Sequence, residues 1–152
     1  MNEVPDAALS EPRLRLIVDS YRRLTGRPLL GIVPDAAHEL ALALWHAPRA
    51  IVAHGSEADP IFFYGNRRAL QLFEMDFAEF TRLPSRLSAE APARAERARL
   101  LQEVTMHGYV DNYAGMRIAK GGRRFLIEDG IVWNLVDAAG VCHGQAATFD
   151  VR

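Results

Sequence analysis

The sequence predicts an α+β fold in which a five-stranded antiparallel sheet carries helices over one face. Helical periodicity dominates the first two thirds of the chain, whereas residues 109–149 show the period-two alternation of strands. Two turn signals, Gly121-Gly122 and Asp137 to Gly140, separate the alternating segments, and connections this short join antiparallel strands. The expected order is two helices, two strands, further helices, and three strands in a meander.

The chain shows no repeat, linker or low-complexity segment that would divide it into several domains. Its 152 residues are enough to bury a sizeable core. We expect residues 1–9 to be a loose tail and residues 10–152 to form a single domain. Within that domain, two N-terminal helices are expected in 10–47 and the sheet with its covering helices in 50–149.

The first N-terminal helix, expected from Ser10 to Thr25, is amphipathic. Its apolar residues recur on one side of the helix, at Leu14, Ile17, Val18, Tyr21 and Leu24. One such stripe requires one covering surface, which is either the protein's own sheet or a second subunit. We expect a homodimer in which this helix contributes to the interface.

The middle of the chain carries local signals for two strands and three helices. Two short apolar runs between residues 50 and 64 predict buried strands. Asn66 is placed to cap the helix that follows, and Asp76 opens a capping box at a further helix. The longest helix is expected from Pro92 to His107.

The dipeptide Asp129-Gly130 admits two interpretations. It favours a hairpin turn, which would divide the strand expected over 123–136. The apolar residues on both sides nevertheless keep a period of two, at Phe125, Ile127, Ile131, Trp133 and Leu135. Because a bulge within one long strand would preserve that face, we favour a continuous strand in which Trp133 is buried.

Composition and charge argue against several classes of protein. A formal net charge of −1 disfavours a general affinity for nucleic acid or anionic membranes. No segment approaches the roughly 18 apolar residues of a membrane span, and the first residues lack the features of a secretory signal. Cys142 is the sole cysteine, so an intrachain disulfide is excluded and a cytoplasmic location is expected.

Motifs for catalysis or metal binding are lacking in the sequence. The five histidines do not show the spacing of metal ligands, and no nucleophile elbow surrounds a serine. The chain also lacks a phosphate-binding loop. We therefore expect no catalytic residues and no metal site.

Polar residues interrupt the apolar faces of the last three strands, and such groups need partners when buried. In a hollow core the partner can be a ligand, with aromatic side chains as flat walls. The alternatives are an internal hydrogen bond, a bulge that turns the group to solvent, and simple packing. We take as candidate ligand-binding residues Asn112, Asp129, Trp133, His143 and Gln145, around a cavity between the sheet and helix 92–107.

Two stretches of the chain resemble the MEKHLA domain family. The first, residues 54–90, reads HGSEADPIFFYGNRRALQLFEMDFAEFTRLPSRLSAE. The second, residues 108–149, contains the motifs YAGMRI, VWNL and GQAATF. The family is PAS-like and occurs free-standing in bacteria and at the C-terminus of plant homeodomain–leucine-zipper regulators. The resemblance implies a PAS-like fold and a sensory or partner-binding role, and it leaves the ligand open.

The expected function is a PAS-like sensory or regulatory module that binds a small apolar ligand or a protein partner and signals in trans. Its cofactor is unknown. The turn at residues 66–70 lacks the cysteine that covalent flavin photochemistry requires, which leaves non-covalent flavin as an alternative. Haem bound through His107 is disfavoured, because a histidine in the last turn also suits the helix dipole. The alternative functions are a small-molecule enzyme (an isomerase or a hydrolase) on a hollow core and a purely structural interaction module.

Overall fold

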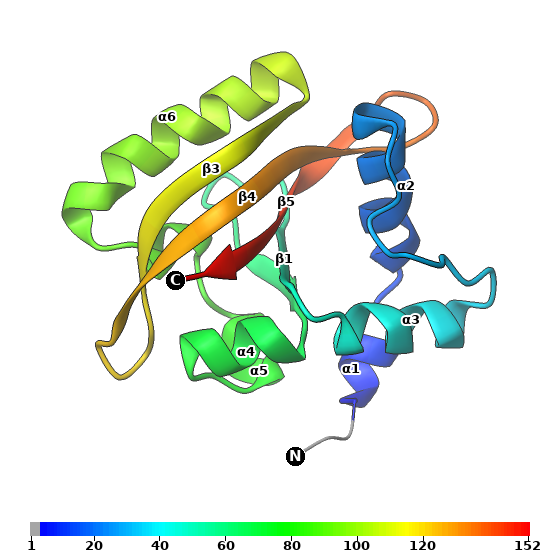
Figure 1. Cartoon of the computed structure of the whole chain (residues 1–152), viewed down its shortest axis with the longest axis horizontal. Coiled ribbons are helices and arrows are strands. Elements are labelled where there is room, and N and C mark those ends of the chain that lie inside the picture. The colour runs from blue at the N-terminus through cyan, green and yellow to red at the C-terminus, as the bar shows by residue number, and fades with distance from the viewer. Residues whose placement is uncertain (1–3) are drawn as a thin grey trace.

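The computed structural model describes residues 4–152, with residue 92 described by its backbone alone. The chain forms one five-stranded antiparallel sheet in the order β2-β1-β5-β4-β3, with helices packed against it (Figure 1). The strands are β1 (Ala50–His54), β2 (Phe62–Gly65), β3 (Tyr109–Ile118), β4 (Arg124–Val136) and β5 (Cys142–Val151). The helices are α1 (Asp6–Leu9), α2 (Leu14–Thr25), α3 (Ala37–His46), α4 (Arg67–Phe73), α5 (Phe77–Phe80) and α6 (Ala91–His107), with a 3₁₀ turn over Ser85–Ser88. The predicted fold class is confirmed.

Asn66 links three elements at the junction of β2 and α4. Its side-chain oxygen accepts from the backbone N–H of Ala69 at 3.1 Å, which caps α4, and from that of Ile51 at 3.0 Å. Its amide nitrogen donates to the carbonyls of Leu44 and Arg49, at 3.1 and 2.9 Å. The side chain is fully buried. The predicted cap is confirmed, and it also joins α4 to α3 and β1.

The predicted capping box at α5 is also present. The backbone N–H of Glu79 donates to the Asp76 carboxylate at 2.7 Å, and the backbone N–H of Asp76 donates to the Glu79 carboxylate at 3.2 Å. Two donors that a helix N-terminus leaves without partners are thus satisfied by side chains.

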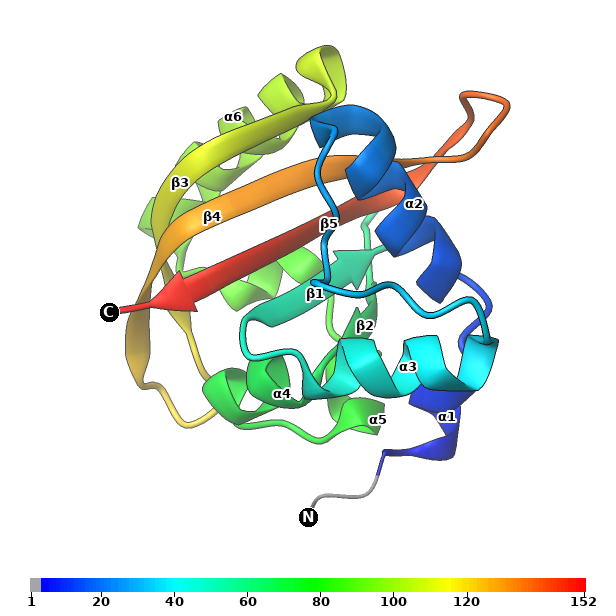
Figure 2. The ribbon, with the colours of Figure 1, turned by 45° about the vertical axis from the view of Figure 1, so that its right-hand side comes forward.

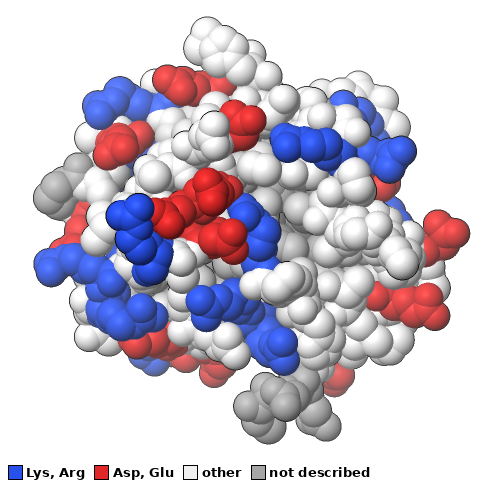
Figure 3. Space-filling view, in the orientation of Figure 1, with Lys and Arg blue, Asp and Glu red and all other residues white. Residues whose placement is uncertain are grey.

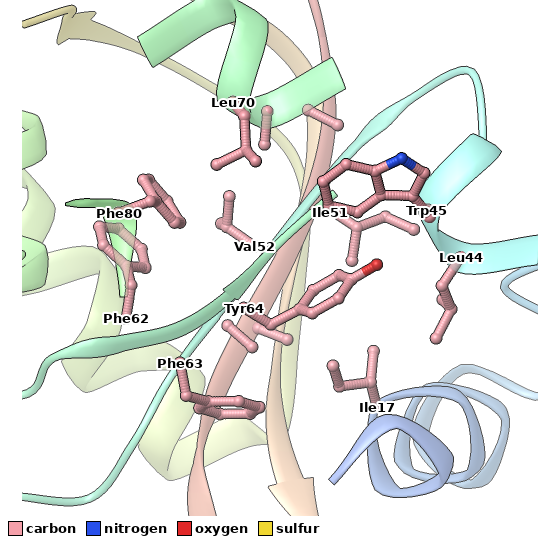
Figure 4. Close-up of a cluster of buried hydrophobic side chains, with 14 of the residues drawn as sticks. Ile17, Leu44, Trp45, Ile51, Val52, Phe62, Phe63, Tyr64, Leu70 and Phe80 are labelled. Carbon is pink, nitrogen blue, oxygen red and sulfur yellow. The ribbon is translucent and has the colours of Figure 1, made fainter. Parts of the chain in front are cut away.

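One part of the hydrophobic core joins β1 and β2 to the helices α2, α3 and α5. In Figure 4, Tyr64 of β2 extends among Leu44 of α3, Ile51 of β1 and Ile17 of α2. Phe62 of the same strand stacks on Phe80 of α5, with ring centroids 4.3 Å apart. Aromatic and aliphatic side chains from distant segments therefore hold β1 and β2 between two groups of helices.

Helix α2 crosses the sheet at β4, on the face opposite α6 (Figure 2). Four residues of its apolar stripe are buried there, namely Leu14, Ile17, Val18 and Tyr21. The stripe therefore covers the protein's own sheet and offers no free surface to a second subunit. The homodimer stays a prediction, without the support that this helix was expected to give.

The expectation of a loose tail over residues 1–9 is wrong for Asp6–Leu9, which forms α1. Ala8 is buried in the main core and makes this turn part of the domain. The Ser10 hydroxyl donates to the Asp6 carbonyl at 2.8 Å. Ser10 thus lies at the C-terminal end of α1, and its side chain does not cap the N-terminus of α2. Residues 1–3 lie outside the described residues.

Strand β4 continues through Asp129-Gly130, as favoured from the sequence, and Asp129 takes a positive φ of 51° at a bulge. The expectation that the bulge preserves one face is wrong, because the extra residue reverses the alternation. We call the face of the sheet that packs against α6 the inner face and the face under α2 the outer face. Ile127 lies on the inner face before the bulge, and Val132 lies on the inner face after it. Trp133 consequently faces α2 on the outer face.

Candidate ligand cavity

An interior cavity of about 50 Å³ lies between the inner face of the sheet and the helices α4 and α6. Its walls are mainly apolar side chains, including Val52, Phe62, Phe73, Leu100, Ile127 and Val132. A space of this size holds roughly three to five water-sized groups. Four polar side chains of particular interest reach it, from β1, α6, β3 and β5.

Arg97 enters the cavity from α6 and is 9% exposed. Its guanidinium group makes no hydrogen bond or ion pair with the residues that the structure describes. Burial, followed by the nearby charge of Arg117, lowers the pKa of Arg97 to about 10. Desolvation and the like charge both disfavour the charged form, and among the described residues no carboxylate forms an ion pair with this guanidinium to offset them.

Arg117 enters from β3 and is 7% exposed. Its guanidinium donates to the Tyr113 hydroxyl at 3.1 Å and to the Met116 carbonyl at 2.8 Å. Gly115 lies between the two side chains, and a Cβ at that position would come within 2.3 Å of the Tyr113 hydroxyl. The local sequence YAGMR thus allows the tyrosine and the arginine to meet over a residue without a side chain.

His54 ends β1 and is 7% exposed. Its Nδ1 lies 2.9 Å from the Gly55 carbonyl, which can only accept, so Nδ1 carries the proton. Its Nε2 is buried and has no hydrogen-bond partner among the described residues. Burial lowers the pKa of His54, opposed by the Gly55 hydrogen bond and assisted by the charge of Arg97. The ring is therefore neutral, and Nε2 is an unused acceptor.

Gln145 lines the cavity from β5 and ties the sheet to α6. Its amide nitrogen lies 3.1 Å from the Leu101 carbonyl and 3.1 Å from the Asn134 side-chain oxygen. Asn134 of β4 in turn donates to the Val104 carbonyl at 2.9 Å. This network gives the floor of the cavity direct contacts with the backbone of the covering helix.

Of the five residues predicted to bind a ligand, Gln145 alone lines this cavity. Asn112 and Asp129 sit at irregularities of β3 and β4 with φ of 52° and 51°, and both are exposed. The bulge conformation turns each side chain out of the face that strict alternation would assign to it.

Trp133 and His143 also lie away from the cavity. Trp133 is buried as predicted, but it donates from its indole to Ser20 on the outer face. His143 is exposed in the turn between β4 and β5, where its Nε2 lies 2.8 Å from the Asp137 carboxylate. The expected cavity near Trp133 is thus corrected to the opposite face of the same strand.

The polar residues of the cavity that were missed from the sequence include His54, Arg97 and Arg117. A signal existed for one of them. Arg97, Leu100 and Val104 follow the spacing i, i+3, i+7, which places the arginine on the buried face of α6. Arg117 and His54 give no comparable signal, because strand ends often carry polar residues.

Within the part of the chain that the structure describes, no three His, Cys, Asp or Glu side chains are grouped to hold a metal ion. His107 is exposed at the end of α6. Among the same residues, no helix has the length and apolar character needed to cross a membrane.

The fold is that of PAS domains. The chain is similar to a PAS domain from Colwellia psychrerythraea, with 16% identity, 75% of this chain and 94% of that chain covered, and a TM-score of 0.63. It is also similar to an RNA-binding light-oxygen-voltage receptor, with 17% identity, 81% and 35% coverage, and a TM-score of 0.66. A third similar structure is the PAS domain, in complex with ethanol, of a LuxR-family transcriptional regulator from Burkholderia thailandensis. Its identity is 18%, its coverage 72% and 93%, and its TM-score 0.56.

At the sequence level, the chain is similar to plant regulatory proteins. It is 26% identical over 128 residues to Homeobox-leucine zipper protein HOX29 from Oryza sativa subsp. indica, and the subsp. japonica protein matches equally. The match covers 83% of this chain and 15% of each relative's length. The family model of the MEKHLA domain matches residues 12–151. The chain therefore belongs to the MEKHLA domain family and has its PAS-like fold.

Proposed function

We propose that this domain is a sensory module that binds a small molecule in the cavity beneath α6. The observation that carries the proposal is the cavity itself, which retains about 50 Å³ of space beside the buried Nε2 of His54, an acceptor without a hydrogen-bond partner among the described residues. Protein interiors are close-packed, and voids larger than a water molecule are few. An apolar space with a few convergent polar groups is the usual form of a ligand site.

The size of the cavity limits the ligand to a few non-hydrogen atoms. Drug-sized ligands and cofactors occupy about 300–1,000 Å³, so a flavin or a haem would require the core to open substantially. A small occupant is compatible with the fold, since the LuxR-family PAS domain has been solved in complex with ethanol.

A regulatory role suits the polar groups of the cavity better than a catalytic one. Its ionisable side chains include two arginines and a neutral histidine, whereas no carboxylate among residues 4–152 lines it. Acid–base catalysis of isomerisation or hydrolysis usually requires a second titratable group with a complementary pKa. We therefore propose binding without turnover.

The hydrogen bonds from Gln145 and Asn134 to α6 supply a route from the cavity to the surface. A ligand that moves Gln145 would alter its contact with the Leu101 carbonyl and shift the exposed face of α6. A protein partner that recognises that face would then receive the signal in trans.

The test is a ligand screen by native mass spectrometry and NMR on the intact chain and on Ala147→Leu, which fills the cavity from β5. The matched control is Ala114→Leu at an exposed position of β3. We expect small molecules to shift resonances around the cavity in the wild type and the control, and not in Ala147→Leu. Equal responses in all three proteins would place binding elsewhere and overturn the proposal.

A further inference from the structure

The charges around the cavity are unbalanced. Elsewhere among the described residues, arginines form ion pairs with carboxylates near the surface, for example Arg49 with Asp150 and Arg86 with Asp59. Figure 3 shows positive and negative side chains interspersed on one face of the molecule. The two arginines of the cavity have no such partner, although they are the most buried arginines described.

Burial without a counter-charge is costly for a guanidinium group. An unpaired ion in a protein interior carries a desolvation cost that a neutral hydrogen bond only partly offsets. Arg117 has two neutral acceptors, and Arg97 has none among the described residues. A carboxylate in the cavity would supply the missing charge and could accept paired hydrogen bonds from a guanidinium fork.

His54 requires a hydrogen-bond donor on the ligand, whereas the two arginines require acceptors. Because Nδ1 of His54 donates to the Gly55 carbonyl, its Nε2 can only accept a hydrogen bond. A carboxylate has no hydrogen to give, whereas a hydroxyl group on the same ligand does. The cavity therefore presents donors for an anionic group and one acceptor for a hydroxyl group.

We infer that the cavity selects a short hydroxycarboxylate, whose carboxylate pairs with Arg97 and Arg117 and whose hydroxyl donates to Nε2 of His54. This inference rests on the proposed function and adds the chemical class of the ligand. The limit of roughly three to five water-sized groups restricts the carbon skeleton to about two atoms, because a two-carbon hydroxycarboxylate already has about five non-hydrogen atoms. The apolar walls suit such a short skeleton.

Three probes separate the features of the ligand in an NMR titration at constant ionic strength and pH. Glycolate carries both a carboxylate and a hydroxyl, acetate lacks the hydroxyl, and ethylene glycol lacks the charge. We expect glycolate to bind at least about tenfold more tightly than either of the others, since each lost bond to a buried group costs about that factor.

The matched variants are Arg97→Met, which keeps the apolar stem without the charge, and Arg99→Met at an exposed position of the same helix. We expect Arg97→Met to weaken glycolate by at least about tenfold and to leave ethylene glycol within about twofold, while Arg99→Met changes neither. Without ligand, the melting temperature of Arg97→Met should rise, because an unpaired buried charge is removed. A purely structural role of Arg97 would lower it.

The outcomes separate this inference from the proposed function. If ethylene glycol binds as tightly as glycolate in the wild type and in Arg97→Met, the ligand class is wrong and the cavity remains a binding site. If none of the three probes binds the wild type, this inference fails, whereas the proposed function is decided separately by the ligand screen on the wild type and Ala147→Leu. If Arg97→Met does not fold, two measurements still test the ligand class. The wild type should bind glycolate more tightly than ethylene glycol, and Arg97→Lys, which keeps the positive charge, should retain this preference.

Discussion

The indole Nε1 of Trp133 donates a hydrogen bond to the Ser20 hydroxyl at 3.1 Å, and this bond joins α2 to the outer face of the sheet. Trp133 also contacts Tyr21 of α2. Their rings lie edge to face, with an interplanar angle of 74° and a centroid separation of 4.8 Å. Trp133 has no measurable exposure. It is therefore an anchor for the N-terminal helix and lies on the far side of the sheet from the cavity.

Trp133→Ala should lower the free energy of unfolding by about 3–5 kcal/mol, because it removes a fully buried aromatic side chain and leaves a void. Chemical unfolding measures the change, and glycolate binding to the folded variant should stay as in the wild type. Met116→Ala, at an exposed site on β3, is the control and should change stability by less than about 0.5 kcal/mol. A loss below about 1 kcal/mol for Trp133→Ala would mean that α2 is not anchored there.

Asn66→Ala should be among the most destabilising polar substitutions in the chain. It removes one cap and takes a partner from three further backbone groups, the N–H of Ile51 and the carbonyls of Leu44 and Arg49, at a cost of about 3 kcal/mol or more. The control is Asp76→Ala, a surface cap that should cost about 1 kcal/mol. Equal losses in chemical unfolding would show that the additional bonds of Asn66 contribute nothing.

The two caps could be predicted from the sequence because a cap and its partner lie within three residues of each other. The polar lining of the cavity could not, because His54, Arg97 and Arg117 come from β1, α6 and β3 and meet only after folding. The error over Trp133 has a different cause. Period two was followed through Asp129, but a residue in the left-handed region adds one position to the strand and reverses its faces.

His54 should make the protein less stable in mild acid. Burial, the largest effect, lowers its pKa in the folded state, while Arg97 lowers it and Glu57 raises it to a smaller extent. The unfolded chain, with a pKa of about 6.5, therefore binds the proton at a higher pH than the folded one. Stability from the neutral ring is complete above about pH 6.5 and decreases as the pH falls from there towards the folded pKa.

His54→Gln removes this titration, and its free energy of unfolding should depend less on pH between neutrality and mild acid. His38→Gln, at an exposed position of α3, serves as the control and should keep the wild-type pH dependence. Urea unfolding at a series of pH values makes the comparison. If the wild type and His54→Gln follow parallel curves, the ring is not buried as the structure shows.

Asp129→Val tests the bulge that divides the two faces of β4. A β-branched residue is strongly disfavoured at a φ of 51°, so the substitution should cost about 1–2 kcal/mol, whereas Asp129→Gly should be neutral or slightly stabilising. The backbone carbonyl of residue 129, which accepts from Arg49, is kept in both variants. Glu128→Val is the control, because its backbone lacks a positive φ and its exposed ion pair with Arg152 contributes little. If chemical unfolding finds Asp129→Val as stable as Asp129→Gly, the strand does not need the left-handed residue there. In that case the bulge cannot be what directs Trp133 to α2 and Val132 to the cavity.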